Sequence, residues 1–466
     1  MERTLIKDLR DHVGKTVTIM GWVSVRRDQG KMVFLDIRDA TGSVQTVVLP
    51  KSPALDTAKE LAREFVVEVE GEVSARPAQN VNSDVPNGDI EVAVSGIQIL
   101  NSSETPPFDI TVDTAALNEE VRLKYRYVDL RSERMQRIIR LRSEFVHACR
   151  EFLHERGFVE IETPLLTEST PEGSRDFVVP SRLHKGKFYA LPQSPQQYKQ
   201  LLMAGGFERY FQLARAVRDE DLRSDRGFEH TQIDIEMSFV EEGDVMRLIE
   251  EMVVQTAEQL GRHIAQKPFP RFTFADAMER FGTDKFDMRT EEEKINGALS
   301  FAWVYRFPFF EQAPDGQWTF THNPFSAPIP EHAELLLKKE RIGDILTAQY
   351  DLVCNGFEVG GGSIRAHRAE LLRATYEVMG HSPEEIESRV GHMLKAFSLG
   401  TPPHGGIALG VERLVMTLAG EEHLREVQAF PMTRGGQTSV MSAPKELSDA
   451  QLQELGITFQ KPPRHE

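Results

Sequence analysis

The feature that most constrains the fold of this chain is a change in its hydrophobic pattern near residue 105. The first hundred residues contain five segments in which apolar and polar residues alternate: 16–28, 32–40, 42–50, 64–76 and 89–100. Such alternation is typical of half-buried strands, and the segment 52–63, between the third and fourth of them, has a helical pattern. This order predicts a five-stranded β-barrel of the OB type at residues 1–105.

A break in all periodicity follows the barrel. Pro106 and Pro107 interrupt the chain as they would in an interdomain linker, so we assign residues 106–135 to a linker or hinge. Apolar residues then recur at helical spacing over 134–156, and the helices and strand pairs beyond lack the parallel βαβ rhythm. Residues 136–466 are therefore predicted to form an α+β domain, built on an antiparallel β-sheet flanked by helices.

Net charge, the length of the apolar runs and the number of cysteines exclude several classes of function. A net charge of −17 argues against non-specific adhesion to nucleic acid, so a polyanion would have to be met by a local basic face. No apolar run reaches the roughly 18 residues that cross a bilayer, and the first residues lack the pattern of a signal peptide. We therefore expect a cytoplasmic protein with no membrane partner. Cys149 and Cys354, the only cysteines, are expected to be buried thiols.

One segment concentrates opposed charges. Between residues 215 and 239, Arg218, Arg223 and Arg226 lie among seven carboxylates, and the segment ends in the alternation of a strand. A buried triphosphate needs arginines that bind phosphate oxygens, and it needs carboxylates that hold those arginines in place. The segment indicates a nucleotide-binding hairpin, and a solvated hairpin of ion pairs is the alternative.

Further segments point to the same kind of ligand. Lys199 follows a proline turn in "QSPQQYKQ", where a solvated helix lysine is the alternative interpretation. Asp351 and Glu358 lie in strand-like sequence before three glycines and Arg365, and carboxylates in such a place suit Mg²⁺ beside phosphates. None of these segments resembles a P-loop or a dinucleotide fingerprint, so the nucleotide would have to lie on a sheet.

The barrel carries a weaker signal. Arg27, Phe34, Gln45 and Glu91 lie on its first, second, third and last predicted strands. OB-type barrels hold single-stranded nucleic acid by aromatic stacking and by polar contacts to base edges. A core position for Phe34 and a solvated face for Gln45 are the alternative.

Together, the motifs resemble those of the class II aminoacyl-tRNA synthetases. The segment "GFVEIETPLL" is similar to motif 1 of that class, the hairpin that includes Arg218–Glu220 is similar to motif 2, and "GVERL" is similar to motif 3. More narrowly, "QSPQQYKQ", "RDEDLRSDR", "TQIDIEMSF", "EVGGGSIR" and "GTPPHGGIALG" resemble aspartyl-tRNA synthetases of the bacterial type. The order of the motifs matches that family from the barrel to about Ile457.

The resemblance implies ATP-dependent attachment of L-aspartate to the 3′ end of tRNA(Asp) through an aspartyl-adenylate, with Mg²⁺ as the cofactor. An enzyme that also charges tRNA(Asn) with aspartate is the alternative. An asparagine synthetase-like enzyme or a non-catalytic RNA-binding paralogue is more remote. The implied partners are tRNA(Asp), ATP, L-aspartate and a second copy in a homodimer, with tRNA(Asn) added in the alternative.

The functional positions of the family have counterparts in this sequence. The catalytic residues would be Arg218, Glu220 and Arg413. ATP would be bound by Arg218, Asp219, Glu220, Gly227, His230, Glu358, Gly410, Val411, Glu412 and Arg413, and Mg²⁺ by Asp351 and Glu358. L-Aspartate would be bound by Glu172, Ser194, Gln196, Lys199, Arg218, Gln232, Asp234, His322 and Arg365. The anticodon would be read by Arg27, Phe34, Gln45 and Glu91, with tRNA discrimination near Gln29 and Gln79.

The sequence also departs from the bacterial pattern. Bacterial-type members usually carry an extra domain between motifs 2 and 3, whereas here about residues 283–306 join the flanking segments almost directly. The insertion is therefore expected to be minimal or absent. His230 stands where a phenylalanine usually stacks on adenine, Asn323 follows His322 where a second histidine is common, and Gly227 replaces a residue that often contacts ATP.

Overall fold

The computed structural model describes residues 2–169 and 173–459. The chain divides into two compact units, Met1–Asn118 with Tyr127–Glu133 and Glu119–Arg126 with Arg134–Glu466. The expected linker is thus shared, because part of it belongs to each unit. Among the helices of the described residues, none is long and apolar enough to cross a membrane.

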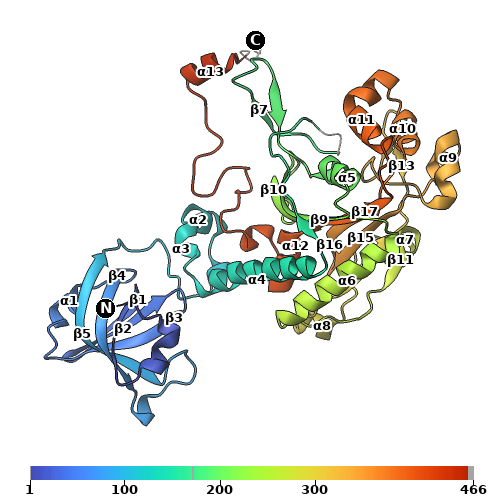
Figure 1. Ribbon diagram of the computed structural model, residues 1–466. Helices are drawn as coiled ribbons and strands as arrows, with labels where there is room; N and C mark the ends of the chain where they lie inside the picture. The colour runs from blue at the N-terminus through green and yellow to red at the C-terminus, as the bar shows by residue number, and fades with distance from the viewer. Residues whose placement is uncertain (1, 170–172, 460–466) are drawn as a thin grey trace. The chain divides into compact units, whose positions relative to one another are not determined.

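The first unit contains a closed barrel with the strand order β1-β2-β3-β5-β4 (Figure 1). Its strands are β1 (Thr16–Gln29), β2 (Met32–Asp39), β3 (Gly42–Val48), β4 (Val66–Ala75) and β5 (Ile90–Asn101), and α1 (Leu55–Glu60) lies between β3 and β4. Val33, Leu35 and Ile37 of β2 are buried in the barrel core, while the residues between them face outward. The predicted OB-type barrel is confirmed.

The second unit is built on an eight-stranded sheet with the order β11-β12-β15-β16-β17-β10-β9-β6 (Figure 1). Its strands are β6 (Val159–Glu160), β9 (Arg209–Val217), β10 (Glu229–Ser238), β11 (Arg271–Thr273), β12 (Phe301–Tyr305), β15 (Gln349–Cys354), β16 (Phe357–Ile364) and β17 (His404–Gly410). The six central strands are antiparallel, as expected, but β11 and β6 pair with their neighbours in parallel. The sheet is therefore mixed rather than purely antiparallel.

Two small hairpins and the helices complete the unit. The hairpins are β7 (Val178–Pro180) with β8 (Phe188–Ala190) and β13 (Phe310–Gln312) with β14 (Trp318–Phe320). The helices are α2 (Glu119–Lys124), α4 (Glu133–Glu155), α5 (Gln196–Ala204), α6 (Glu242–Gln259), α7 (Phe274–Phe281), α8 (Glu291–Ile295), α9 (Ala333–Lys338), α10 (Ala369–Val378), α11 (Pro383–Phe397), α12 (Val411–Ala419) and α13 (Asp449–Leu455), and α3 (Arg126–Asp129) is shared by both units. Short 3₁₀ helices of this unit are η4 (Pro330–His332), η5 (Ile342–Asp344) and η6 (Leu424–Val427), and those of the first unit are η1 (Ile6–His12), η2 (Ala78–Asn80) and η3 (Thr114–Ala116).

The centre of the sheet has two chemically different faces. Along β10, Ile233 and Ile235 are buried among apolar residues, whereas Gln232, Asp234 and Glu236 alternate with them and point to the other face. Helix α12 packs against β10, β16 and β17. Polar side chains thus emerge from the middle of the sheet on one of its two faces. Both cysteines are buried and reduced, as expected.

Candidate functional site

A polar cavity of about 360 Å³ lies over β10, β16 and β17. It brings together side chains from segments that are far apart in the sequence: the start of α5, the hairpin loop after β9, the glycines of β16 and the start of α12. Of the residues assigned to ATP or L-aspartate from the sequence, it is lined by Ser194, Gln196, Lys199, Arg218, Glu220, Gly227, His230, Gln232, Asp234, His322, Glu358, Arg365, Gly410, Glu412 and Arg413.

The deepest charges of the cavity form a compact network. The Lys199 ammonium donates to Asp234 Oδ1 at 2.6 Å and lies 3.4 Å from Glu236 Oε2. The Arg365 guanidinium donates to both carboxylate oxygens of Glu236, at 2.9 and 3.1 Å, and to Ser363 Oγ at 2.7 Å. These two cations and two carboxylates are each at most 2% exposed. Because each charge has an opposite partner, the network can be buried without an uncompensated ion.

The network leaves hydrogen-bonding capacity for a ligand. The three bonds from Arg365 use three of its five N–H groups. Gln232 Oε1 and Asp234 Oδ2 are buried acceptors that have no partner among the described residues. Burial raises the pKa of Asp234, whereas at Glu236 the opposing charges of Arg365 and Lys199 outweigh burial and lower the pKa. A ligand with both cationic and anionic groups would match these free donors and acceptors.

Two carboxylates lie beside the glycine run of β16. A Cβ built on Gly361 would lie 3.1 Å from Asp351 Oδ1 and 3.5 Å from Glu358 Oε1. One position therefore lies close to both acids, and only a glycine leaves it open. Burial and the neighbouring charge of Glu358 raise the pKa of Asp351, although His322 lies 3.5 Å from its other oxygen and opposes this shift. Two hard oxygen ligands with mutual repulsion suit a Mg²⁺ ion that retains most of its waters.

Two arginines, Arg218 and Arg413, also line the cavity. Arg413 donates to the Glu358 carbonyl at 2.8 Å and lies 3.3 Å from the Asp225 carboxylate, while Arg218 donates to the Gln193 carbonyl at 3.2 Å. Glu220 pairs with Arg226 at 2.8 Å and accepts from Ser174. These contacts fix the guanidinium planes before any ligand arrives.

His230 contributes a planar imidazole ring to the wall of the cavity. Burial, together with the charges of Arg218 and Arg413, lowers the pKa of His230 to about 3. The imidazole is therefore neutral near pH 7. A neutral ring can stack on an aromatic base.

Some expected site residues lie elsewhere. Asp219 is turned toward Arg175, 3.4 Å away, and Val411 is fully buried at the first turn of α12. Neither lines the cavity. Glu412 lines the cavity, but its carboxylate accepts hydrogen bonds from Arg142 at 2.8 Å and from the Thr231 N–H at 2.9 Å. Glu172 lies outside the described residues.

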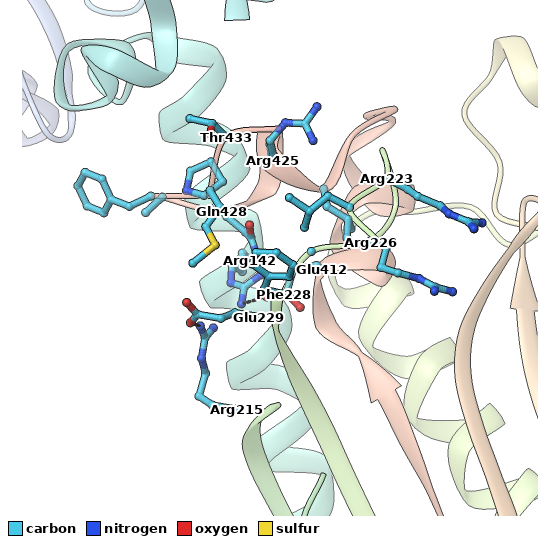
Figure 2. Close-up of a pocket in the computed structure, with 17 residues that line it drawn as sticks. Arg142, Arg215, Arg223, Arg226, Phe228, Glu229, Glu412, Arg425, Gln428 and Thr433 are labelled. Atoms are coloured by element: carbon cyan, nitrogen blue, oxygen red, sulfur yellow. Dashed lines mark hydrogen bonds and ion pairs between the residues drawn. The ribbon is translucent and has the colours of Figure 1, made fainter. Parts of the chain in front are cut away.

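A second cavity, of about 190 Å³, adjoins the first and shares Arg226, Gly227, Glu412 and Leu424 with it. Figure 2 shows Arg142 and Glu229 on one side of it, while the guanidinium groups of Arg223 and Arg226 extend away from that pair. The charged loop of the hairpin thus separates two cavities.

The four barrel residues that were predicted to contact an anticodon lie on neighbouring strands. Phe34 lies opposite Arg27 in the β1–β2 pair and points outward rather than into the core, and Asp36 lies opposite Gln45. Arg27 donates to Asp36 at 3.0 Å and to Gln45 Oε1 at 3.1 Å, and the Gln45 amide donates to Glu91 at 3.1 Å. The row of hydrogen bonds therefore orients the Gln45 amide. The alternative of a core position for Phe34 is wrong.

The two remaining barrel positions lie at exposed edges. Gln29 is the last residue of β1, and Gln79 lies in η2. Both are exposed.

Three residues of these sites were missed in the sequence. Glu236 shares the face of Gln232 and Asp234 by the period of two, and Asp36 shares the face of Phe34 in the same way, so both could have been found. Lys285, whose ammonium lies 2.9 Å from Glu358 Oε2, comes from a loop without periodicity. No pattern in the sequence points to it.

Comparisons with known proteins agree with the site. The family described as tRNA synthetases class II (D, K and N) matches residues 118–434, and the OB-fold nucleic acid binding domain matches residues 17–100. An aspartate–tRNA(Asp/Asn) ligase of Dehalococcoides mccartyi (strain CBDB1) is 37% identical over 587 aligned residues, covering 97% of this chain and 98% of that protein. An aspartate–tRNA(Asp) ligase of Deinococcus radiodurans is 38% identical and covers 95% of this chain and 96% of its own length.

Among solved structures, the asparaginyl-tRNA synthetase of Pyrococcus horikoshii in complex with asparaginyl-adenylate superposes with a TM-score of 0.74 at 25% identity. That match covers 93% of this chain and 98% of the other. The alignment with the Dehalococcoides protein spans 587 positions, more than the 466 residues of this chain, so the relative carries residues that this chain lacks. The location of the shortening, about 283–306, stays a prediction.

Proposed function

The chain belongs to the class II tRNA synthetases of the aspartyl, lysyl and asparaginyl group, and we propose that it attaches L-aspartate to the 3′ end of tRNA(Asp) through an aspartyl-adenylate. The observation that carries the choice of amino acid is the meeting of Lys199 and Arg365 in one cavity, where each is only 2% exposed. Lys199 comes from α5 and Arg365 directly follows β16, and Glu236 contacts both. Two cations that Glu236 keeps in position suit the side-chain carboxylate of aspartate.

The other end of the amino acid matches the unpaired acceptors. Gln232 Oε1 and Asp234 Oδ2 would accept hydrogen bonds from the α-ammonium group, with Ser194 and Gln196 beside them. Asparagine in place of aspartate would give up the charge-assisted hydrogen bonds to Lys199 and Arg365, which costs about 1.5–3 kcal/mol, or roughly a ten- to hundredfold loss in selectivity. The charge of the side chain is thus enough to select aspartate.

Adenylate formation would depend on alignment and electrostatics. Arg218 would hold the α-phosphate and a carboxylate oxygen of aspartate, Arg413 would hold the terminal phosphate, and His230 would stack on the adenine. Glu220, held by Arg226, would face the nucleotide or the incoming terminal adenosine. The aspartate α-carboxylate attacks the α-phosphorus and pyrophosphate leaves, so the protein needs no nucleophile of its own.

Mg²⁺ would be held by Asp351 and Glu358, whose oxygens converge near Gly361. When bound, it would neutralise charge that develops on the phosphates. His322 and Gln349 contact Asp351, and the Gln349 amide donates to Asp351 Oδ1 at 2.7 Å. These contacts keep one carboxylate oriented toward the β16 glycines.

The barrel would read the anticodon. Phe34 would stack on an unpaired base, while Arg27, Gln45 and Glu91 would contact base edges. The fixed orientation of the Gln45 amide supports this role. Its oxygen accepts from Arg27 and its nitrogen donates to Glu91, whereas a reversed amide would place an N–H donor against the Arg27 guanidinium. A homodimer, formed through the motif 1 segment, and action in the cytoplasm complete the proposal.

A second candidate activity is the charging of tRNA(Asn) with aspartate as well. The observation that favours it is that the Dehalococcoides relative is named for both tRNAs. Gln29 and Gln79 are the residues of this chain that would decide the matter. The Deinococcus relative, named for tRNA(Asp) alone, has similar identity to this chain, so overall likeness does not decide it.

The test uses the full-length enzyme in two assays. Pyrophosphate exchange should depend on aspartate and show little response to asparagine; equal exchange with both would overturn the amino-acid assignment. Charging of separate transcripts of tRNA(Asp) and tRNA(Asn) then distinguishes the two candidate activities. Aspartate accepted by the first transcript alone would exclude the second candidate.

A further inference from the structure

Lys285 lies outside every recognised motif and contacts the nucleotide site. It belongs to the loop after α7, and its ammonium lies 2.9 Å from Glu358 Oε2. The other oxygen of the same carboxylate, Oε1, is the one that lies near Gly361 together with Asp351 Oδ1. The two oxygens of Glu358 therefore have different tasks: one faces the other acid and one is neutralised by a lysine.

The surroundings of Lys285 favour a mobile role over a fixed one. Its side chain is 43% exposed, in contrast to Lys199, which is 2% exposed. The charges near it are Glu358 and Asp284, which attract the ammonium, and Arg413, which repels it. Arg413 itself lines the cavity beside the glycines of β16. A flexible lysine in this place can leave Glu358 when a stronger competitor for the carboxylate arrives and another anion is near.

We propose that Lys285 is the resting counter-ion of Glu358, and that its ammonium moves to a phosphate oxygen of ATP when a divalent cation takes its place on the carboxylate. The inference deepens the proposed function, on which it rests for the identity of the nucleotide. Lys285 would keep Glu358 in position while the site is empty and would add a positive charge beside Arg413 when the polyphosphate is bound. Lysine suits the exchange because it binds phosphate as a compact point charge on a flexible stem.

The proposal predicts two opposite effects of one substitution. In Lys285→Met, Glu358 has no resting competitor, so the nucleotide-free enzyme should bind Mn²⁺ about three- to fivefold more tightly, as expected for loss of a half-exposed ion pair. ATP with Mg²⁺ should bind about tenfold more weakly or worse, because a charge-assisted hydrogen bond to phosphate is lost. Lys285→Arg should restore much of the ATP affinity.

The experiment measures Mn²⁺ binding to the full-length protein by electron paramagnetic resonance and ATP binding by calorimetry, both without aspartate or tRNA. Lys294→Met is the matched control, since Lys294 is also 43% exposed and pairs with Glu291 at 2.7 Å away from the cavity. It should change neither affinity. A purely structural role for Lys285 would lower both affinities or neither.

Either an unchanged ATP affinity or a Mn²⁺ affinity no higher than that of the unmodified enzyme would overturn the proposal. Neither measurement involves the amino acid. An enzyme that binds ATP as predicted but fails to activate aspartate would therefore contradict the proposed substrate and leave the role of Lys285 standing.

Discussion

The cavity over the central sheet and the outward face of the barrel both carry charged side chains, but they place those charges in opposite environments. Lys199, Arg365, Asp234 and Glu236 are almost fully buried and neutralise one another. On the barrel, the Arg27 side chain is 45% exposed and that of Asp36 is 26% exposed. Buried charges lose water and must be positioned by the protein, so they can select by charge; exposed charges remain solvated and contribute less each.

The largest expected effect comes from breaking the buried network. Lys199→Met removes the cation that holds Asp234 and would leave the aspartate carboxylate with one partner fewer. Aspartate activation should fall by about a hundredfold to several-thousand-fold, since an unpaired buried charge costs about 3–5 kcal/mol. Pyrophosphate exchange measures the loss.

The control for this substitution is Lys338→Met, which removes an exposed lysine that pairs with Glu334 on α9. It should leave exchange unchanged. Circular dichroism must show that Lys199→Met still folds. Near-normal exchange in a folded Lys199→Met protein would refute the role of Lys199 and would remove the contrast between the two regions.

The next effect in size concerns the barrel. Phe34→Ala removes the aromatic surface on which an anticodon base would stack, and the KM for tRNA should rise about 5- to 150-fold, as expected for about 1–3 kcal/mol of stacking. Adenylate formation should not change, because it does not involve the anticodon. Leu100→Ala, at an exposed apolar residue at the end of β5, is the control. Equal losses in charging and in pyrophosphate exchange would contradict an anticodon-specific role.

Salt distinguishes the two regions without any mutation. Raising KCl from about 50 to 200 mM shortens the distance over which exposed charges interact, and it lowers the free energy gained when phosphate contacts release counterions. The KM for tRNA should therefore rise about tenfold or more. The KM for aspartate should change less than about twofold, since Lys199 and Arg365, which would bind it, are each only 2% exposed and are screened less by salt. Steady-state kinetics at several salt concentrations test this. A parallel rise in both constants would mean that the pocket is far wetter than its burial indicates.

Much of this comparison could be predicted from the sequence, and the limits have physical causes. The resemblance to the family identified Gln232 and Asp234, and the alternation of β10 would have added Glu236, which lies on the same face. The parallel edge strands β6 and β11 have only two and three residues, which is too short for a period to be seen.

Contacts between distant segments could not be predicted. Arg365 and Glu236 are 129 residues apart in sequence, and only the pairing of β16 and β10 with β17 brings them together. Lys285 reaches Glu358 from a loop that carries no periodic pattern. The resemblance to a family identified residues that the motifs contain, but it did not reveal which side chains hold those residues in place.

The smallest expected effect concerns pH, and it tests how dry the buried side is. His404 is fully buried beside the pocket, where it accepts from or donates to Gln200 at 3.0 Å. Burial lowers the pKa of His404 to about 4, against the attraction of Glu236. The unfolded chain binds a proton at this histidine near pH 6.5, whereas the folded chain does so only near pH 4. The folded state therefore loses up to about 1.4 kcal/mol per pH unit as the pH falls through that window.

The measurement compares urea unfolding at pH 7 and pH 5.5 for the unmodified protein and for His404→Gln, in which the amide can keep a hydrogen bond to Gln200. The decrease in stability between the two pH values should be smaller in the variant, by about 1 kcal/mol, because one titrating group is gone from the unfolded chain. His184→Gln, at an exposed histidine of the β7–β8 hairpin, should leave the decrease unchanged. If His404→Gln also leaves it unchanged, His404 titrates in the folded protein much as it does in water. The pocket would then be open to solvent, and its environment would no longer differ from that of the barrel face.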